Sequence, residues 1–524
     1  MTMTRRNALK LAGAAGLAVP LGAGGCSVFG SDVTGQLLTS QVELPQPFQM
    51  PLPVPPVLEP VRSRDGVDYY EVTQEEGSAE ILPGHKTTVW GYNGIFPGPT
   101  FETRSGRQVV VRQRNELPTP ISTHLHGGHT PPRSDGYPTN LVLPTRGGSP
   151  TYAEHGDSPG WTFHRGHKDY TFPQQQRATT LWYHDHRMDF TGPQVWRGLA
   201  GFHIIRDDED DALPLPRGDR DIPLMICDRS FAADGSLRYP ALDPSLQGEM
   251  GVRRKYMEGV LGDVVLVNGA AWPYLEVSNT RYRFRLLNAS NARRYELTLD
   301  PPPPEGAVFT QVGSDGGLLA APVGHDTIPI AQAERFDVII DFSKYPVGTS
   351  VTLRNRIGGD STARVMQFRV TRKEKDTTAV PRRLSDMSEF EQLRESGAAA
   401  TRRFNFTRGG SRDGRPVWTI NNKMFDPARM DARPRLGTTE IWEFVTDVHH
   451  PVHIHLVQFK VLGRARNGQK PLPTDTGWKD TVDLRPGNVA RVLVPFTGYR
   501  GRYIFHCHNL EHEDMAMMAA FEVV

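Results

Sequence analysis

The chain has 524 residues and a formal net charge of +1, with 60 Lys and Arg against 59 Asp and Glu residues. It contains no extended basic block, which argues against a nucleic acid as its partner. The length exceeds one ordinary core and favours about three domains. The 51 Gly and 43 Pro residues, with few long helical periodicities, favour an all-β fold of many short strands and turns.

Residues 1–30 have the layout of an export signal rather than of a folded domain. Arg5, Arg6 and Lys10 precede an apolar run rich in Ala, Gly and Leu, and the paired arginines indicate the twin-arginine type. A membrane helix is the alternative, but the run is short, Gly-rich and interrupted by Pro20. We therefore expect an exported protein of the cell envelope or extracellular space, with no transmembrane span once mature.

The sequence AGGC at 23–26 resembles a bacterial lipoprotein cleavage site, although Ala23 stands where a Leu is expected. Cleavage there would leave Cys26 as the lipidated residue and give the protein a lipid anchor. The other two cysteines, Cys227 and Cys507, could form one disulfide at most. If Cys507 binds a metal, Cys227 has no intramolecular partner and is expected to be a small buried hydrophobe.

Three stretches of the chain look like variations of one unit. They are residues 89–126, 266–299 and 418–455. Each has an Asn-containing turn, an aromatic residue soon after, and a β-rich run with period-two alternation, as in VVVRQRN, YRFRLLN and EIWEFVT. Because each copy is far longer than a solenoid repeat, the pattern predicts three β-sandwich domains.

Composition predicts where these domains begin and end. We expect the first domain over 31–206, the second over 218–372 and the third over 402–524. An acidic, Pro-rich link at 207–221 and a charged link at 373–401 are interpreted as solvated linkers.

The middle stretch differs from the other two in one place. The first stretch ends in THLH and the third in HPVHIH, whereas the second reads YELTL at 295–299. The middle domain is therefore expected to carry no metal ligands. We interpret it as a spacer that holds the outer domains at the right separation.

Four His-X-His pairs occur in the chain. They are His124/His126, His184/His186, His453/His455 and His506/His508. Residues two apart in a strand project to the same face, so each pair offers two imidazoles to one site. Eight imidazoles exceed what a single zinc ion needs. They suit several metal ions held close together, each with a position open for a small ligand.

Cys507 lies between the two histidines of the last pair, so its side chain is expected on the opposite face of that strand. The strand would then contact two metal sites, with sulfur on one side and imidazoles on the other. His512 and Met517 follow Cys507 closely, and His450 precedes the HIH pair. A thiolate, two histidines and a distant thioether form the ligand set of a blue-copper electron-transfer centre.

The motifs HLHGG, WYHDH, HPVHIH and HCHNLEHEDMAMM resemble the four copper-binding motifs of the multicopper oxidases. The resemblance runs through all three predicted domains. It is strongest to the three-domain bacterial spore-coat laccases, with bilirubin oxidases and phenoxazinone synthase nearby. It implies three cupredoxin-like Greek-key β-sandwiches that hold four copper ions, one of type 1, one of type 2 and two of type 3.

The resemblance also implies a ligand for each copper position of the family. The type 1 copper would take His450, Cys507, His512 and, axially, Met517. The type 2 copper would take His124 and His453. The type 3 pair would take His126, His184, His186, His455, His506 and His508.

By the same analogy, four residues are expected to act in the reaction. His512 would receive electrons near the surface, and Cys507 would carry them toward the three-copper cluster. Asp135 and Glu513 match positions that manage protons, and the reduction of O₂ to water consumes protons. The alternative for each acid is a surface or structural carboxylate.

The predicted function is a laccase-like oxidation of phenols, aryl amines or bilirubin-like donors, coupled to the four-electron reduction of O₂ to water by a monomeric enzyme. One alternative is a metallo-oxidase acting on Cu(I), but no Met-rich insertion is present among the 14 methionines. Another is a non-catalytic cupredoxin-like envelope protein, which would be expected to lack ligands. Four His-X-His pairs also exceed what a two-domain nitrite reductase requires.

The remaining histidines are interpreted as structural. His449 adjoins His450, but the HPxHxH pattern favours His450 as the ligand. The others have no partner at ligand spacing and are expected to be ordinary polar residues. They are His85, His129, His155, His164, His167, His203 and His325.

Overall fold

The computed structural model describes residues 34–146, 159–412, 415–464 and 470–524. The predicted export signal and Cys26 lie outside these described residues. Within them, the predicted all-β fold is confirmed, because the main sheets form three sandwich-like pairs along the chain. Residues 33–524 cluster as one compact unit, so the three pairs pack closely on one another.

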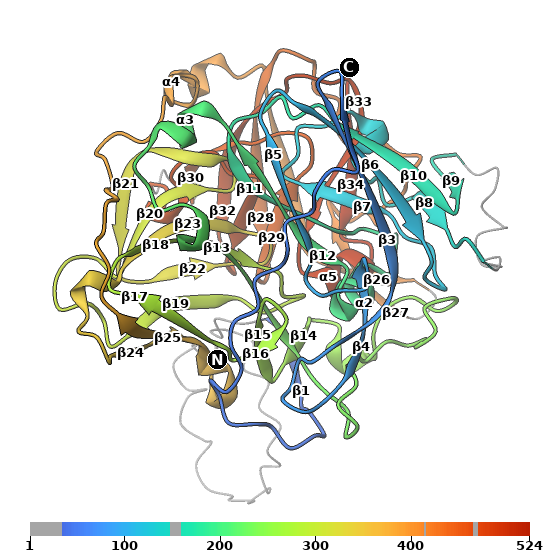
Figure 1. The fold of residues 1–524 in the computed structure, drawn as a ribbon. Coiled ribbons are helices and arrows are strands. Elements are labelled where there is room, and N and C mark those ends of the chain that lie inside the picture. Colours follow the sequence, from blue (N-terminus) through green and yellow to red (C-terminus); the bar gives the residue numbers. More distant parts are fainter. Residues whose placement is uncertain (1–33, 147–158, 413–414, 465–469) are drawn as a thin grey trace, which may run out of the picture. The chain divides into compact units, whose positions relative to one another are not determined.

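The first sandwich pairs a five-stranded sheet with a four-stranded sheet (Figure 1). The larger sheet contains β2 (Arg62–Arg64), β3 (Val67–Ala79), β4 (Thr87–Tyr92), β6 (Gln108–Asn115) and β10 (His167–Phe172). The smaller sheet contains β5 (Gly98–Arg104), β7 (Thr123–His126), β11 (Thr179–Asp185) and β12 (Ala200–Arg206). Two further strands, β8 (Asn140–Leu143) and β9 (Thr162–Arg165), pair in parallel.

The second sandwich pairs a seven-stranded sheet with a five-stranded sheet. The larger sheet contains β13 (Asp221–Arg229), β15 (Val264–Val267), β16 (Ala270–Ala271), β18 (Arg281–Asn288), β20 (Phe309–Ser314), β21 (Gly317–His325) and β23 (Arg335–Asp341). The smaller sheet contains β17 (Tyr274–Ser278), β19 (Tyr295–Asp300), β22 (Ile328–Ile330), β24 (Ser350–Asn355) and β25 (Arg364–Arg372). Separately, β1 (Gln36–Leu38) pairs in parallel with β14 (Val260–Gly262).

The third sandwich pairs a five-stranded sheet with a four-stranded sheet. The larger sheet contains β26 (Ala400–Arg412), β27 (Arg415–Ile420), β28 (Thr439–Thr446), β30 (Lys460–Gly463) and β32 (Val489–Pro495). The smaller sheet contains β29 (His450–Ile454), β31 (Thr481–Leu484), β33 (Gly501–Cys507) and β34 (Met518–Val523). The α-helices of the described residues are short: α2 (Thr191–Arg197), α3 (Asp208–Ala212), α4 (Ser388–Gln392) and α5 (Leu510–Asp514).

The same asparagine turn occurs once in each sandwich. Asn93, Asn268 and Asn421 have φ values of 56°, 50° and 52°, in the left-handed region that Asn tolerates better than most residues. The side-chain oxygen of each accepts a hydrogen bond from a backbone amide of the longest neighbouring strand, at 2.9, 2.8 and 2.8 Å. These strands are β3, β13 and β26, so the turn ties a tight reversal to the strand beside it.

The interpretation of residues 207–221 as a solvated linker is wrong. Asp210 is buried and the side chain of Asp221 is only 1% exposed. They pair with Arg283 at 2.7 Å and Arg285 at 2.8 Å on β18. Burying these carboxylates is tolerable because each has a guanidinium partner. The second link is also anchored in part, since Leu384 and Met387 within it are buried.

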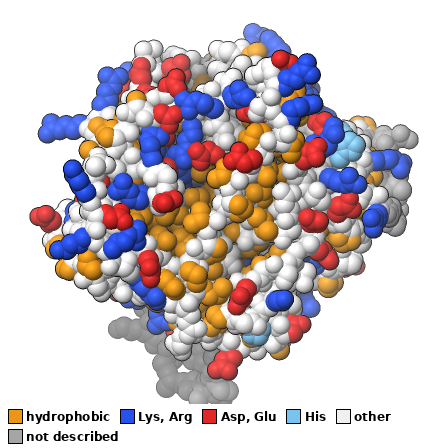
Figure 2. All heavy atoms as spheres, in the orientation of Figure 1, with side chains coloured by type: hydrophobic (Ala, Val, Ile, Leu, Met, Phe, Trp, Pro, Cys, Tyr) orange, Lys and Arg blue, Asp and Glu red, His pale blue; other side chains and the backbone are white. Residues whose placement is uncertain are grey.

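Residues 42–60 run as an extended, Pro-rich arm along the sheets rather than within them. Two isolated parallel bridges, Pro51 to Tyr274 and Val57 to Thr100, hold this arm. Its side chains Val54 and Val57 are about half exposed, at 53% and 50%. Figure 2 shows apolar side chains gathered on the face that the arm crosses in Figure 1.

The smaller sheets of the first and third sandwiches carry all four His-X-His motifs. β7 and β11 are antiparallel neighbours in the first sandwich, as are β29 and β33 in the third. The helices that follow β11 and β33, α2 and α5, pack against each other. This packing brings the two sheets together. None of the described helices is long and apolar enough to cross a membrane.

Candidate metal centre

Eight imidazoles meet where the first and third sandwiches face each other. They are His124, His126, His184, His186, His453, His455, His506 and His508, here called the imidazole cluster, and each is at most 1% exposed. His186, His455 and His508 lie just past the ends of their strands. Their backbone amides still donate to the carbonyls of Ser122 at 2.5 Å, Ile504 at 3.1 Å and Pro451 at 2.6 Å, so the strand alignment continues through the second histidine of each pair.

The cluster divides into groups whose donor atoms lie within 4.8 Å of one another. Three groups consist of imidazoles alone: His124 with His126 and His453, His126 with His184 and His508, and His186 with His455 and His506. In each of the last three His-X-His pairs, the two histidines belong to different groups. The pairs therefore join neighbouring sites instead of each building one site.

In one group, a carboxylate lies beside every imidazole. His186 Nε2 and His455 Nε2 each lie 3.3 Å from His506 Nε2. On the outer side, His186 Nδ1 and His506 Nδ1 lie 3.3 and 3.0 Å from the carboxylate oxygens of Glu513, and His455 Nδ1 lies 2.8 Å from Asp135 Oδ2. Both acids are buried, so neither is a surface carboxylate. A carboxylate on one ring nitrogen directs the other nitrogen toward a metal.

Backbone carbonyls orient a second pair of imidazoles in the same way. His124 Nδ1 donates to the carbonyl oxygen of Asp135 at 2.5 Å, and His453 Nδ1 donates to that of Asp480 at 2.8 Å. The two Nε2 atoms face each other at 3.4 Å. Both acceptor positions therefore converge on one point between the sandwiches.

The third group leaves imidazole nitrogens unsatisfied. His126 is turned so that its Nε2 lies 3.1 Å from Asp480 Oδ1 and 3.2 Å from Thr481 Oγ1. Its Nδ1, the Nε2 of His184 and both nitrogens of His508 are buried without a hydrogen-bond partner among the described residues. Buried polar atoms are normally paired, so this arrangement fits a bound cation.

Burial keeps seven of these imidazoles neutral. Desolvation lowers the pKa of His184 to about 3. It also lowers, well below the usual value, the pKa of His124, His126, His186, His453, His455 and His508. Neutral imidazole is the form that binds metals. Desolvation likewise raises the pKa of Asp135 well above its usual value.

A second candidate centre, here called the thiol site, consists of His450, Cys507 and His512. The Cys507 sulfur lies 3.3 Å from His450 Nδ1 and 3.7 Å from His512 Nδ1, and the two nitrogens are 3.0 Å apart. All three side chains are buried. Burial raises the pKa of Cys507 well above its usual value, so a thiolate here requires a cation beside it.

The predicted axial ligand, Met517, lies next to the thiol site in the fold. Its side chain is fully buried in the same hydrophobic cluster as Cys507. The Cys507 amide donates to the Met517 carbonyl at 3.1 Å, and the Met517 amide donates to the His512 carbonyl at 3.0 Å. Ligation by its sulfur stays a prediction.

The surroundings of His512 could not be read from the motifs. The Trp418 ring stacks on the His512 imidazole, with centroids 3.8 Å apart, and its Nε1 donates to the Met257 carbonyl at 3.1 Å. His512 Nε2 lies 3.2 Å from the Glu258 carbonyl. His512 is therefore fully buried, beneath a cover formed by Trp418 and residues 257–258.

Several other histidines have ordinary hydrogen-bond partners. His203 lies 2.9 Å from Thr103 Oγ1, and His449 Nδ1 lies 3.0 Å from Thr34 Oγ1. His155 lies outside the described residues. Cys227 is a free, fully buried cysteine within the main hydrophobic cluster of the second sandwich.

Comparisons with known proteins identify the family. Two family models described as multicopper oxidase match residues 397–524 and 73–210. The laccase of Bacillus subtilis is 39% identical, over 90% of this chain and 97% of that protein. This chain belongs to the multicopper oxidases. The bilirubin oxidase of Albifimbria verrucaria is 35% identical to this multicopper oxidase, over 94% of this chain and 84% of that protein.

A solved structure gives the same result for the fold. The crystal structure of a laccase from Pediococcus acidilactici superposes with a TM-score of 0.77 at 33% identity, covering 93% of this chain and 96% of that chain. The predicted cupredoxin-like fold class is thereby confirmed. As a multicopper oxidase, the protein is an oxidoreductase that uses O₂ and depends on copper.

Proposed function

We propose that this multicopper oxidase is laccase-like and oxidises small aromatic donors, namely phenols, aryl amines or bilirubin-like pigments. The observation that carries the proposal is the segment 506–508. Its thiol belongs to the thiol site, while its two imidazoles belong to two groups of the imidazole cluster. Two centres of different chemistry thus share one short stretch of backbone.

The donor sets support the copper assignment. A thiolate with two imidazoles suits a blue-copper site, which we assign to His450, Cys507, His512 and Met517. We assign the type 2 copper to His124 and His453. We assign the type 3 pair to His126, His184, His186, His455, His506 and His508. When bound, copper would accept single electrons at the thiol site and supply four electrons to O₂ in the imidazole cluster.

The protein's own residues would orient the ligands and supply protons. Glu513 touches His186 and His506, and Asp135 touches His455 and His124. These acids hold the rings with Nε2 pointing inward and lie where protons are consumed. At the thiol site, Trp418 and the Glu258 carbonyl exclude water from His512.

Electrons must therefore enter through the cover of His512. Glu258, whose side chain is 52% exposed, and Arg408 form an exposed ion pair at this position. The Arg408 guanidinium lies 5.3 Å from the Trp418 ring centroid. A donor that binds here would lie within a few side chains of His512, which suits outer-sphere electron transfer.

Copper quantitation with visible and EPR spectra, followed by O₂ uptake with a phenolic donor, tests the proposal. We expect about four copper ions per chain, intense blue absorption and phenol-dependent O₂ uptake. A colourless, copper-free protein after copper loading would exclude the proposed centres. O₂ uptake with Cu(I) but with none of the organic donors would instead favour a metallo-oxidase.

A further inference from the structure

The middle sandwich supplies none of the eight imidazoles, yet it reaches the imidazole cluster through one arginine. Arg335 begins β23 and is fully buried. Its guanidinium donates to both carboxylate oxygens of Asp480, with Nη1 to Oδ1 at 2.7 Å. Arg–carboxylate pairs of this two-point kind fix geometry as well as charge.

Other contacts hold the Arg335 side chain in place. Nε donates to the Thr180 carbonyl at 3.0 Å, and Nη1 also donates to the Ala333 carbonyl at 2.9 Å. Nη2 donates to the Asp315 carbonyl at 3.1 Å, while the Arg335 backbone amide donates to Asp315 Oδ1 at 2.8 Å. With every guanidinium nitrogen bonded, the group has little freedom to move relative to its partners.

Asp480 passes this constraint to two imidazoles. Its Oδ1 lies 3.1 Å from His126 Nε2 and 3.6 Å from His453 Nδ1, and its carbonyl oxygen accepts from His453 Nδ1 at 2.8 Å. The Thr481 hydroxyl donates to the same Oδ1 at 3.0 Å. His126 is turned the opposite way from the imidazoles held by Glu513, because this carboxylate lies on its Nε2 side.

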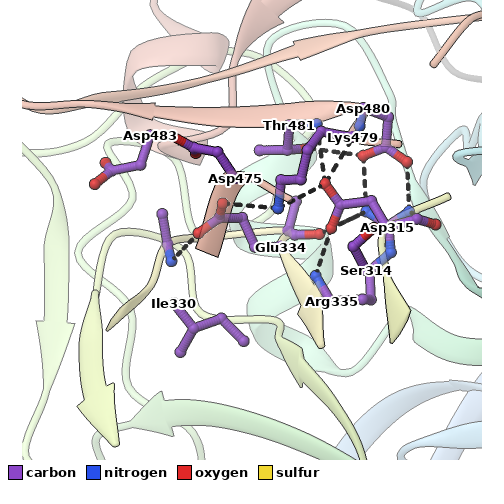
Figure 3. Close-up of polar contacts among 12 residues, drawn as sticks. Ser314, Asp315, Ile330, Glu334, Arg335, Asp475, Lys479, Asp480, Thr481 and Asp483 are labelled. Atoms are coloured by element: carbon purple, nitrogen blue, oxygen red, sulfur yellow. Dashed lines mark hydrogen bonds and ion pairs between the residues drawn. The ribbon is translucent and has the colours of Figure 1, made fainter. Parts of the chain in front are cut away.

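A buried ion cluster surrounds the Arg335–Asp480 pair (Figure 3). The Lys479 ammonium lies 3.0 Å from Asp315 Oδ2 and 3.0 Å from Glu334 Oε1. Burial by itself lowers the pKa of Lys479, but Asp315 and Glu334 outweigh burial and raise the pKa. Two cations thus face three carboxylates, so the buried charges around the Arg335–Asp480 pair are compensated by partners of opposite sign.

We propose that Arg335 is a positioning residue for the imidazole cluster, acting through Asp480 on His126 and His453. The middle sandwich is then more than a spacer, because it sets the ring orientation of one proposed type 3 ligand and one proposed type 2 ligand. This inference rests on the proposed function. Metal sites depend on such outer partners, whose loss typically weakens metal binding about 10- to 100-fold.

The test compares R335M, R335K and D480N with the wild-type holoenzyme. Copper per chain is measured after dialysis against graded chelator, together with the type 2 EPR signal and the blue absorption. R335M is expected to lose cluster copper at about 10- to 100-fold lower chelator concentration, with an altered type 2 signal and unchanged blue colour. R335K keeps the charge but not the two-point geometry, so its loss should be intermediate.

Arg285 offers a matched control. It is buried in the neighbouring strand β18 and pairs with Asp221 and Asp337, but no contact joins it to Asp480 among the described residues. R285M should therefore keep wild-type copper retention and EPR. Wild-type signals in R335M, or an equal loss in R285M, would overturn the inference.

If R335M does not fold, the D480N variant tests the inference instead. This variant removes the negative charge beside His126 while nearly keeping the shape of the side chain. An altered type 2 signal with retained blue colour would support the inference, and an unaltered signal would refute it. A wild-type protein that binds no copper would refute the proposed function itself, which keeps the two failures distinguishable.

Discussion

The thiol site and the imidazole cluster are built in different ways, although one strand serves both. His450, Cys507 and His512 all come from the third sandwich, so one folded sandwich provides every donor. The imidazole cluster draws half of its rings from β7 and β11 and half from β29 and β33. The first centre depends on local strand geometry, whereas the second depends on how two sandwiches dock.

The largest effect is expected from C507S, which should destroy the thiol site and leave the imidazole cluster intact. Serine nearly preserves the shape but removes the soft sulfur that a blue-copper site needs. We expect complete loss of the blue absorption and of donor oxidation, with the type 2 EPR signal retained because its proposed imidazoles, His124 and His453, belong to the imidazole cluster and not to the thiol site. Visible and EPR spectra with O₂ uptake provide the measurement.

The other described cysteine provides the control for this experiment. Cys227 is buried in the second sandwich, so C227S should keep the blue colour. Continued turnover in C507S would contradict the proposed electron route.

E513Q should affect the imidazole cluster and spare the thiol site. Glutamine nearly keeps the shape of Glu513 but can neither carry a charge beside His186 and His506 nor release a proton. We expect O₂ turnover to fall by about 10²- to 10⁴-fold, the range typical of a lost acid–base group. Anaerobic reduction of the blue centre by the donor should keep its wild-type rate in stopped-flow experiments.

Glu511 lies on the same helix and makes a suitable control. It is buried, but its carboxylate accepts from Tyr239 at 2.8 Å and Asn291 at 2.9 Å instead of touching an imidazole. E511Q should therefore lose much less O₂ turnover than E513Q. Slow anaerobic reduction of the blue centre in E513Q would contradict the prediction that Glu513 acts on the imidazole cluster alone.

The smallest effect is expected from W418F, which alters the cover of the thiol site. Phenylalanine can still stack on His512 but loses the hydrogen bond to Met257, a contribution of about 1 kcal/mol. We expect kcat/KM for phenolic donors to change by less than about tenfold, with copper content unaltered.

Trp442 provides the comparison, because its Nε1 also makes one buried hydrogen bond, to Glu440 at 2.9 Å. W442F should leave kcat/KM unchanged. Equal changes in the two variants would mean that the effect of W418F comes from general loosening of the third sandwich.

The sequence could predict those features whose signal is local. Histidines two residues apart and a cysteine between two of them are visible without a structure, because strand geometry alone fixes their relative directions. The middle stretch was also recognisable by its missing histidines. The Asn turns belong to the three similar stretches of the sequence, although only the structure reveals their hydrogen bonds to the neighbouring strands.

Features that depend on distant pairing could not be predicted. Arg335 and Asp480 lie 145 positions apart, and neither belongs to a motif that suggests its partner. The sequence of the acidic link predicts solvated carboxylates, because Asp210 and Asp221 find Arg283 and Arg285 only in the folded protein. The cover of His512 likewise joins residues 257–258 to a helix more than 250 positions further along the chain.

Thr34 and Gln36 lie beside the thiol site. Thr34 contacts His449, the neighbour of His450, and the Gln36 amide donates to the Gly259 carbonyl at 2.8 Å, next to Glu258. An electrode tether attached at Thr34 would therefore start close to the proposed point of electron entry. Immobilisation through this residue should favour direct current to the enzyme, and immobilisation through a distant loop should require a soluble mediator.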